Sequence, residues 1–167
     1  MSGRAWIFGD DIDTDVLAPG PYLKGPIAVL AAHCLEAVDP DFARQVAPGD
    51  VVIAGANFGM GSSREQAAQA LKELGVAAVI ARSFAGIFYR NAFNLGLLAL
   101  ISTEVGDIAP GTRVAVDAEA GVLRDLTGDT AHACEPVPAH LMALVRDGGL
   151  VPHLERRLAA ARQENDE

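Results

Sequence analysis

The hydrophobic residues in the middle of the chain fall into three short runs separated by two amphipathic stretches. The runs 51–54, 76–81 and 97–101 are almost uninterrupted and have the length of buried strands. The stretches 63–74 and 83–95 place apolar residues three or four positions apart, as expected of helices with one buried face. This pattern predicts a strand–helix–strand–helix–strand core and therefore an α/β fold.

Weaker signals lie before this core and within it. A first strand is predicted near 5–8, followed by an acidic turn over 10–15. A helix is predicted over 27–37, ended by the breaker at 39–41. Ser83 is predicted to cap the second helix of the core, because it immediately precedes that helix.

The last third of the chain has a different pattern of apolar and polar residues. Apolar and polar residues alternate over 113–117 and 122–126, which predicts a β-hairpin. Two amphipathic helices are predicted over 138–146 and 150–162. The polar tail 163–167 is expected to fray.

Composition excludes several classes of protein without selecting a function. The chain has 167 residues, which suits a single domain over 1–167. No run of ~18 uncharged apolar residues is present, and the opening residues lack the apolar core of a signal peptide. The net charge of −9 argues against nucleic-acid binding. Cys34 and Cys134 lie far apart, so we expect no disulfide framework and a cytoplasmic location.

The most informative segment is the loop that joins the first hydrophobic run to the first helix of the core. Gly59 and Gly61 permit a tight turn and a close approach of the backbone to a ligand. Ser62, Ser63 and Arg64 then arrive at a helix N-terminus, where free N–H groups and the helix dipole favour an anion. The segment predicts a site for a small carboxylate with a serine hydroxyl beside it.

A purely structural interpretation competes with this one. Ser62 with Glu65, and Ser63 with Gln66, have the spacing of a capping box, which is the usual role of serines at helix starts. Nucleotide-binding motifs do not fit, because Arg64 stands where a dinucleotide fingerprint needs its third glycine and no P-loop is present. The Gly-x-Ser-x-Gly motif of serine hydrolases is also absent.

The acidic turn invites a metal-binding interpretation as well. Asp11, Asp13 and Asp15 copy the first three ligands of a calcium loop, but Val16 replaces the required glycine and Tyr22 the closing glutamate. Aspartates that bond nearby backbone N–H groups explain the turn better. We therefore assign no metal ligand to this chain.

Four segments carry a specific set of motifs in a fixed order and span nearly the whole chain: 9–15, 52–67, 81–92 and 148–154. Together they resemble the signature blocks of the aconitase and isopropylmalate dehydratase swivel-domain family. The resemblance implies a single swivelling β/β/α domain, as in the C-terminal domain of aconitase. The length of the chain fits the free-standing small subunits of that family.

In the family, a separate large subunit carries a [4Fe–4S] cluster and the swivel domain closes the site. By the match to the family motif, Ser62 is implied as the general base that removes a carbon-bound proton. Ser63 is implied to hydrogen-bond the substrate or to support the oxyanion, and Arg64 to bind a carboxylate in bidentate fashion. Gly59 and Gly61 would offer backbone N–H groups to the anion. With two cysteines the chain cannot supply three thiolates, so the cluster is expected on the partner and no cofactor on this chain.

Substrate choice rests on another loop. In the family, the segment matching 21–25 lies beside the substrate side group and is apolar in isopropylmalate enzymes but cationic in homoaconitate or citrate enzymes. Lys24 could pair with a third carboxylate, or it could extend into solvent. Met60, Gln66 and Gly86 also depart from residues common in the family.

The resemblance therefore predicts the small subunit of a hydro-lyase that isomerises a hydroxy-diacid or hydroxy-triacid by dehydration and rehydration. The leading substrate is 3-isopropylmalate in leucine biosynthesis, and homoaconitate, citrate or a substituted malate are the alternatives. The expected assembly is a heterodimer or heterotetramer with the large subunit. The rival hypothesis is a non-catalytic swivel domain that serves only as a binding or regulatory partner.

Overall fold

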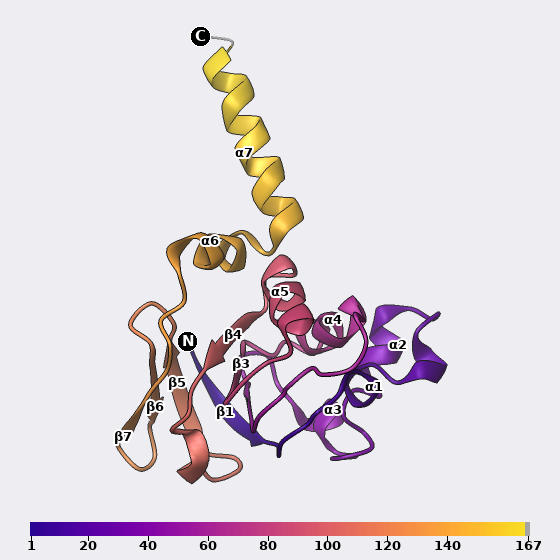
Figure 1. The fold of residues 1–167 in the computed structure, drawn as a ribbon, viewed down its shortest axis with the longest axis vertical. Helices are drawn as coiled ribbons and strands as arrows, with labels where there is room; N and C mark the ends of the chain where they lie inside the picture. Colours follow the sequence, from indigo (N-terminus) through magenta and orange to yellow (C-terminus); the bar gives the residue numbers. More distant parts are fainter. Residues whose placement is uncertain (166–167) are drawn as a thin grey trace.

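The computed structural model describes residues 1–165, which form one seven-stranded sheet with helices packed on it (Figure 1). The strands lie side by side in the order β4-β3-β2-β1-β5-β6-β7. The strands are β1 Ser2–Ile7, β2 Val51–Ala54, β3 Ala78–Ala81, β4 Leu98–Ile101, β5 Arg113–Asp117, β6 Val122–Asp125 and β7 Thr130–Ala133. The α-helices are α1 Thr14–Leu17, α2 Ile27–Ala31, α3 Phe42–Gln45, α4 Glu65–Glu73, α5 Gly86–Asn94, α6 Ala139–Asp147 and α7 Leu150–Asn165. Two 3₁₀ turns complete the description, η1 Gly20–Tyr22 and η2 Val105–Asp107.

The predicted core is confirmed as β2-α4-β3-α5-β4. These three strands pair in parallel, and all of their residues except Ile101 are buried. This burial explains their nearly uninterrupted apolar runs. On α4 the buried residues are Ala67, Ala68, Ala70 and Leu71, and the small alanines allow α2 and α5 to pack closely against it. Gly75 follows this helix with a positive φ of 82°, the conformation expected at a helix end.

β1 joins two differently built halves of the sheet. Its second half pairs in parallel with β2, with Ala5 opposite Val51 and Ile7 opposite Ile53. Its first half pairs antiparallel with β5, with Ser2 opposite Ala115. The strand therefore begins earlier than the hydrophobic run near 5–8 predicts, because the pairing with β5 extends it.

The helix predicted over 27–37 is wrong in its second half. Helix α2 ends at Ala31, and turns follow. Leu35 has a positive φ of 62°, and its N–H donates to the carbonyl of Val16 (2.9 Å) instead of to the preceding turn. This contact with α1, on a distant part of the chain, overrides the local helical pattern.

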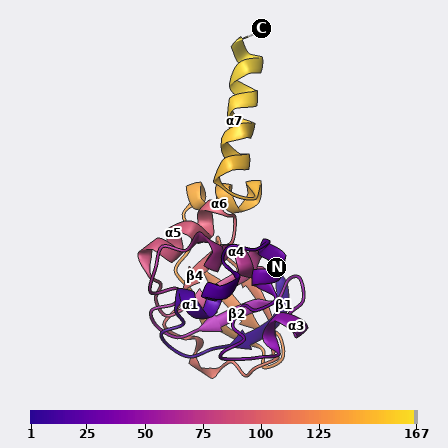
Figure 2. The same cartoon turned by 90° about the vertical axis from the view of Figure 1, so that its right-hand side faces the viewer.

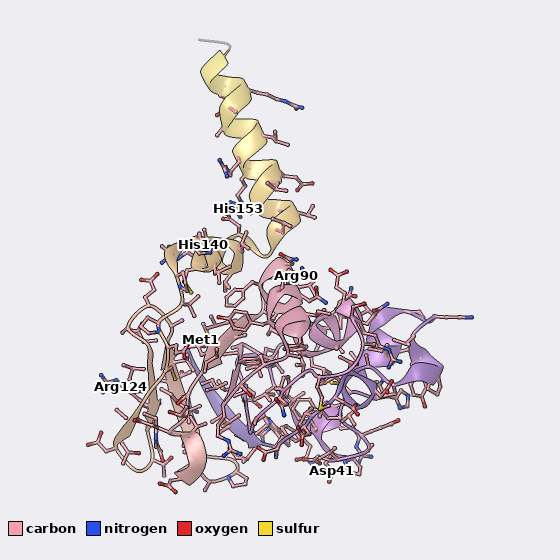
Figure 3. All side chains as sticks on the ribbon, viewed as in Figure 1. Met1, Asp41, Arg90, Arg124, His140 and His153 are labelled. Carbon is pink, nitrogen blue, oxygen red and sulfur yellow. The ribbon has the colours of Figure 1, made fainter. Side chains whose placement is uncertain are left out.

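The hairpin of β5 and β6 is confirmed, and β7 adds a third antiparallel strand that periodicity did not define as an element. Both C-terminal helices are confirmed, and α7 projects clear of the rest of the molecule (Figures 1 and 2). His153, at the base of α7 in Figure 3, pairs through Nδ1 with Asp147 (2.6 Å), and Arg156 binds the same carboxylate (2.5 Å). The hydrogen bond from His153 lowers the pKa of Asp147. These contacts fix the start of α7 against α6.

The fraying predicted for 163–167 stays a prediction. Helix α7 includes residues up to Asn165, and 166–167 lie outside the described residues. Within the described part of the chain, no helix has both the length and the apolar character needed to cross a membrane.

Candidate active site

Two loops at the carboxyl ends of neighbouring strands form the candidate site. The loop after β1 and the loop after β2 meet at one edge of the sheet, because the two strands are parallel and adjacent. Backbone hydrogen bonds join them along their length: Asp11 N to Ala56 O (2.8 Å), Gly59 N to Ile12 O (2.7 Å) and Thr14 N to Met60 O (2.8 Å). The acidic turn after β1 thereby supports the loop after β2.

Ser62 lies in this loop with its side chain exposed, and a threonine from α1 contacts it. The Oγ1 atom of Thr14 accepts the Ser62 N–H (3.0 Å) and lies 3.1 Å from Ser62 Oγ. The capping interpretation of the serines is wrong, because the N-cap position of α4 is Arg64 and no side chain caps it. Ser62 and Ser63 are therefore free of the role that competed with a functional one.

Arg64 is held at one edge of its guanidinium group. Its Nη1 atom donates to the carboxylate of Asp15 and to the carbonyl of Ala18 (3.2 Å). Within the described residues, Nε and Nη2 have no partner, and a quarter of the side chain is exposed. The unused edge has the planar pair of donors that binds a carboxylate in bidentate fashion.

The two glycines of the loop are required by its shape. Gly59 has φ +77°, and a Cβ there would lie 2.2 Å from Phe88 Cγ. Gly61 has φ +107°, and a Cβ there would lie 2.9 Å from Thr14 Oγ1. The Gly59 N–H is used by Ile12, whereas those of Gly61 and Ser63 have no acceptor in the described part of the chain. The amides of Gly61 and Ser63 are thus among those available to an anion.

A second cluster ties the same loop to β3. The Asp10 carboxylate accepts the Ala56 N–H (2.7 Å) and binds Arg82 (2.5 Å), and these two contacts lower the pKa of Asp10. Ser83 does not cap α5, whose N-cap is Ala85; its hydroxyl accepts the Asn57 N–H (2.9 Å) instead. The prediction for Ser83 is therefore wrong, and the side chain fixes the loop.

Lys24 lies apart from these contacts. It is exposed in the segment between η1 and α2 and forms no hydrogen bond or ion pair within the described residues. The segment is anchored nearby, because Tyr22 stacks on His33 with ring centroids 3.7 Å apart. Among the described residues, no hydrogen bond or ion pair joins Lys24 to Ser62 or Arg64.

The described residues contain no group of three or more His, Cys, Asp or Glu side chains that could hold a metal ion. Cys34 and Cys134 are buried on separate parts of the fold, and burial raises the pKa of both thiols. A buried, protonated thiol is a poor metal ligand. These residues do not fit an iron–sulfur cluster.

Comparison with known proteins places the chain in a family. The model of the aconitase C-terminal domain matches residues 33–104. The 3-isopropylmalate dehydratase small subunit of Syntrophus aciditrophicus is 48% identical over 160 residues, which cover 94% of this chain and 97% of that protein. The chain belongs to the 3-isopropylmalate dehydratase small-subunit family.

Two further proteins are similar to this chain over nearly its whole length. The methanogen homoaconitase small subunit of Methanothermobacter thermautotrophicus is 47% identical over 154 residues, covering 92% of this chain and 89% of that protein. The crystal structure of 3-isopropylmalate dehydratase from Methanocaldococcus jannaschii superposes with a TM-score of 0.92 at 42% identity and covers 98% of both chains. The swivel-domain fold expected from the sequence motifs is therefore confirmed.

The motifs located Ser62, Ser63 and Arg64, but periodicity and motif spacing did not single out Thr14 or Asp15 as partners of the site. Both lie in the acidic block shared with the family, where the repeated aspartates indicated a turn or a metal site and not a contact with Ser62 or Arg64. The available signal was the position of Thr14 within a predicted turn that follows a strand.

Proposed function

We propose that the chain is the small subunit of a hydro-lyase that isomerises 3-isopropylmalate by dehydration and rehydration, as in leucine biosynthesis. The observation that carries the proposal is the arrangement of Ser62 and Arg64. The hydroxyl group of Ser62 is exposed, and one edge of the Arg64 guanidinium group is unoccupied. Hydrogen bonds from α1 and from Ser83 fix the loop that carries both residues. The high identity to small subunits of this enzyme over nearly the whole chain supports the substrate class.

The residues of this chain supply proton transfer and substrate binding. Ser62 removes the carbon-bound proton as its alkoxide, and the amides of Gly61 and Ser63 together with Arg64 stabilise negative charge at this end of the site. The free edge of Arg64 binds a substrate carboxylate, and Ser63 adds a hydrogen bond to the substrate. The serine hydroxyl is a weak base in water, so exclusion of water on assembly is part of the mechanism.

The proposal includes a partner, because this site is exposed on one side. A large subunit with a [4Fe–4S] cluster covers it, in a heterodimer or heterotetramer within the cytoplasm. The cluster, when present on that subunit, supplies Lewis-acid activation of the substrate hydroxyl group. The lack of fit between a cluster and the cysteines of this chain supports its placement on the partner.

A second substrate class has specific support. Lys24 is exposed and without a partner in the described residues, and one relative of 47% identity is a homoaconitase small subunit. An unpaired cation beside the substrate would favour a third carboxylate. Homoaconitate is therefore the second candidate, with citrate and substituted malates in the same chemical class.

The test is co-expression of the chain with a cluster-bearing large subunit, anaerobic purification, and assay of 3-isopropylmalate, homoaconitate, citrate and substituted malates. Ser62→Ala serves as the matched variant, since it removes only one hydroxyl group. We expect turnover of one of these acids by the wild-type complex and none by the variant, with assembly intact. Assembly without turnover of any acid would favour the non-catalytic swivel domain instead.

A further inference from the structure

Thr14 stands out among the polar residues near the site because it is buried. The residue is 2% exposed, yet its hydroxyl lies within hydrogen-bond distance of two atoms of the exposed Ser62. The position of Thr14 is fixed independently of Ser62. Its N–H donates to Met60 O (2.8 Å), and Asp13 caps the helix that Thr14 begins by accepting the Val16 N–H (2.8 Å).

The direction of these hydrogen bonds follows from the protons available. The Ser62 N–H can only donate, so Thr14 Oγ1 accepts it with one lone pair (3.0 Å). The single proton of the Thr14 hydroxyl is then free for Ser62 Oγ, 3.1 Å away, and no other acceptor for it is found among the described residues. When Ser62 carries no proton, its oxygen can only accept, and the bond must run from Thr14 to Ser62.

We propose that Thr14 is a positioning residue that orients Ser62 and donates a hydrogen bond to the Ser62 oxygen in its unprotonated, proton-accepting state. This inference rests on the proposed role of Ser62 as the base. A hydrogen bond to a charged oxygen is stronger than one to a neutral hydroxyl, so Thr14 stabilises the reactive state of Ser62 more than its resting state. The charged groups nearest to the pair in the sequence are Arg64, which binds Asp15, and Asp13, whose carboxylate accepts the Val16 N–H.

A purely structural role would look different. A structural contact needs only the Thr14 oxygen as an acceptor for the Ser62 N–H, much as Ser83 Oγ accepts the Asn57 N–H (2.9 Å) in the same loop. Ser83 therefore provides a matched control, because Ser83→Ala removes one hydroxyl acceptor from the loop without touching Ser62. Thr14→Val removes the Thr14 hydroxyl at nearly constant volume, and Thr14→Ser retains it.

The first arm of the test uses the isolated chain and needs no partner. Amide hydrogen exchange at Ser62 is measured by NMR in the wild type, Thr14→Val, Thr14→Ser and Ser83→Ala. We expect exchange at Ser62 to accelerate roughly 3- to 10-fold in Thr14→Val only, and exchange at Asn57 to accelerate in Ser83→Ala only. Unchanged exchange at Ser62 in Thr14→Val would overturn the inference, since the bond would not exist in solution. If valine prevents folding at this buried position, Thr14→Ala removes the same hydroxyl with less bulk.

The second arm uses the complex with the large subunit and follows kcat, KM and the pH profile of kcat. For Thr14→Val we expect kcat to fall roughly 10- to 100-fold with little change in KM, and the ascending limb of the profile to move to higher pH. Thr14→Ser should restore both. A wild-type kcat and profile in Thr14→Val, or equal losses in Thr14→Val, Thr14→Ser and Ser83→Ala, would overturn the inference. Near-normal turnover by Ser62→Ala would instead remove the proposed base and with it the proposed function.

Discussion

Arg64 reaches the site with one edge of its guanidinium group already occupied. Asp15 and the carbonyl of Ala18 hold Nη1, which fixes the plane of the group and turns the Nε and Nη2 edge into the available one. A side chain held in this way loses less conformational entropy when a carboxylate binds. From this arrangement we expect that a basic residue other than arginine would not replace Arg64.

Arg64→Lys should therefore weaken substrate binding although it keeps the charge. Lysine cannot bind Asp15 and a substrate carboxylate through opposite edges of one planar group. We expect KM in the assembled complex to rise by roughly one to two orders of magnitude, corresponding to about 1.5–3 kcal/mol for a lost charge-assisted hydrogen bond. A KM within twofold of the wild type would show that Arg64 does not hold the carboxylate.

Lys24 allows the two substrate classes to be separated by one substitution. If its ammonium pairs with a third carboxylate, Lys24→Leu should cost ~1–3 kcal/mol of transition-state binding for homoaconitate and citrate. The same change should leave 3-isopropylmalate unaffected or improved, because an unpaired ammonium beside an isopropyl group is poorly solvated. The comparison of kcat/KM is internal to one complex. Equal changes for all substrates would mean that the side chain extends into solvent.

The residues that form the site could be predicted from the sequence better than the residues that support them. Ser62 and Arg64 belong to a local motif, whereas Thr14 lies 48 positions from Ser62, and Asp15 lies 49 positions from Arg64. No spacing rule links positions so far apart. Their contact arises only because β1 and β2 are parallel neighbours whose loops emerge at the same edge.

At the scale of elements, the pattern of apolar residues predicted the parallel core correctly, because burial of these residues determines that part of the fold. The second half of the helix predicted over 27–37 did not form, since Leu35 bonds Val16 across the fold. β7 was not defined as an element because its residues, Thr130–Ala133, are mostly exposed and carry a weak pattern. Local patterns thus predicted the buried elements well and missed those that long-range contacts define.

Asp50 shows how one side chain can organise the ends of two elements. The residue is 5% exposed, and its carboxylate accepts hydrogen bonds from Arg4 N (2.9 Å), Trp6 Nε1 (2.9 Å) and Ala47 N (3.0 Å). Burial by itself would raise the pKa of Asp50, but these donors, with the charge of Arg4, lower it below the ordinary value of 3.8. The carboxylate therefore stabilises the fold above this pH, and its contribution is lost as the pH falls through the depressed pKa.

Asp50→Asn should destabilise the chain by about 1–3 kcal/mol at neutral pH, because it weakens bonds to a buried charged acceptor. The difference from the wild type should shrink as the pH is lowered below 3.8. Trp6 is the single tryptophan and donates to this carboxylate, so its fluorescence reports both the unfolding transition and the acid titration. A difference in stability that is the same at pH 7 and in strong acid would contradict this role.

At the scale of the whole molecule, the chain should not carry iron on its own. Its two cysteines lie in separate buried positions, and the described residues offer no group of three possible ligands. After anaerobic purification without a partner, iron and sulfide analysis should find far less than one cluster per chain, and no hydroxy-acid should be turned over. Iron and sulfide should appear with the large subunit. A stoichiometric cluster in the isolated chain would contradict the two-subunit model.

The double use of β1 has a consequence for the growing polypeptide on the ribosome. β2, β3 and β4 are all complete by Ile101, so the parallel half of the sheet, in which β2 pairs with the Ala5–Ile7 part of β1, can form early in synthesis. The Ser2–Arg4 part must wait for β5, which begins at Arg113. Until then its backbone groups form an open edge of the kind that pairs with foreign strands. The nascent chain is thus most prone to aggregate just before β5 emerges. In the folded chain β5 covers this edge of β1.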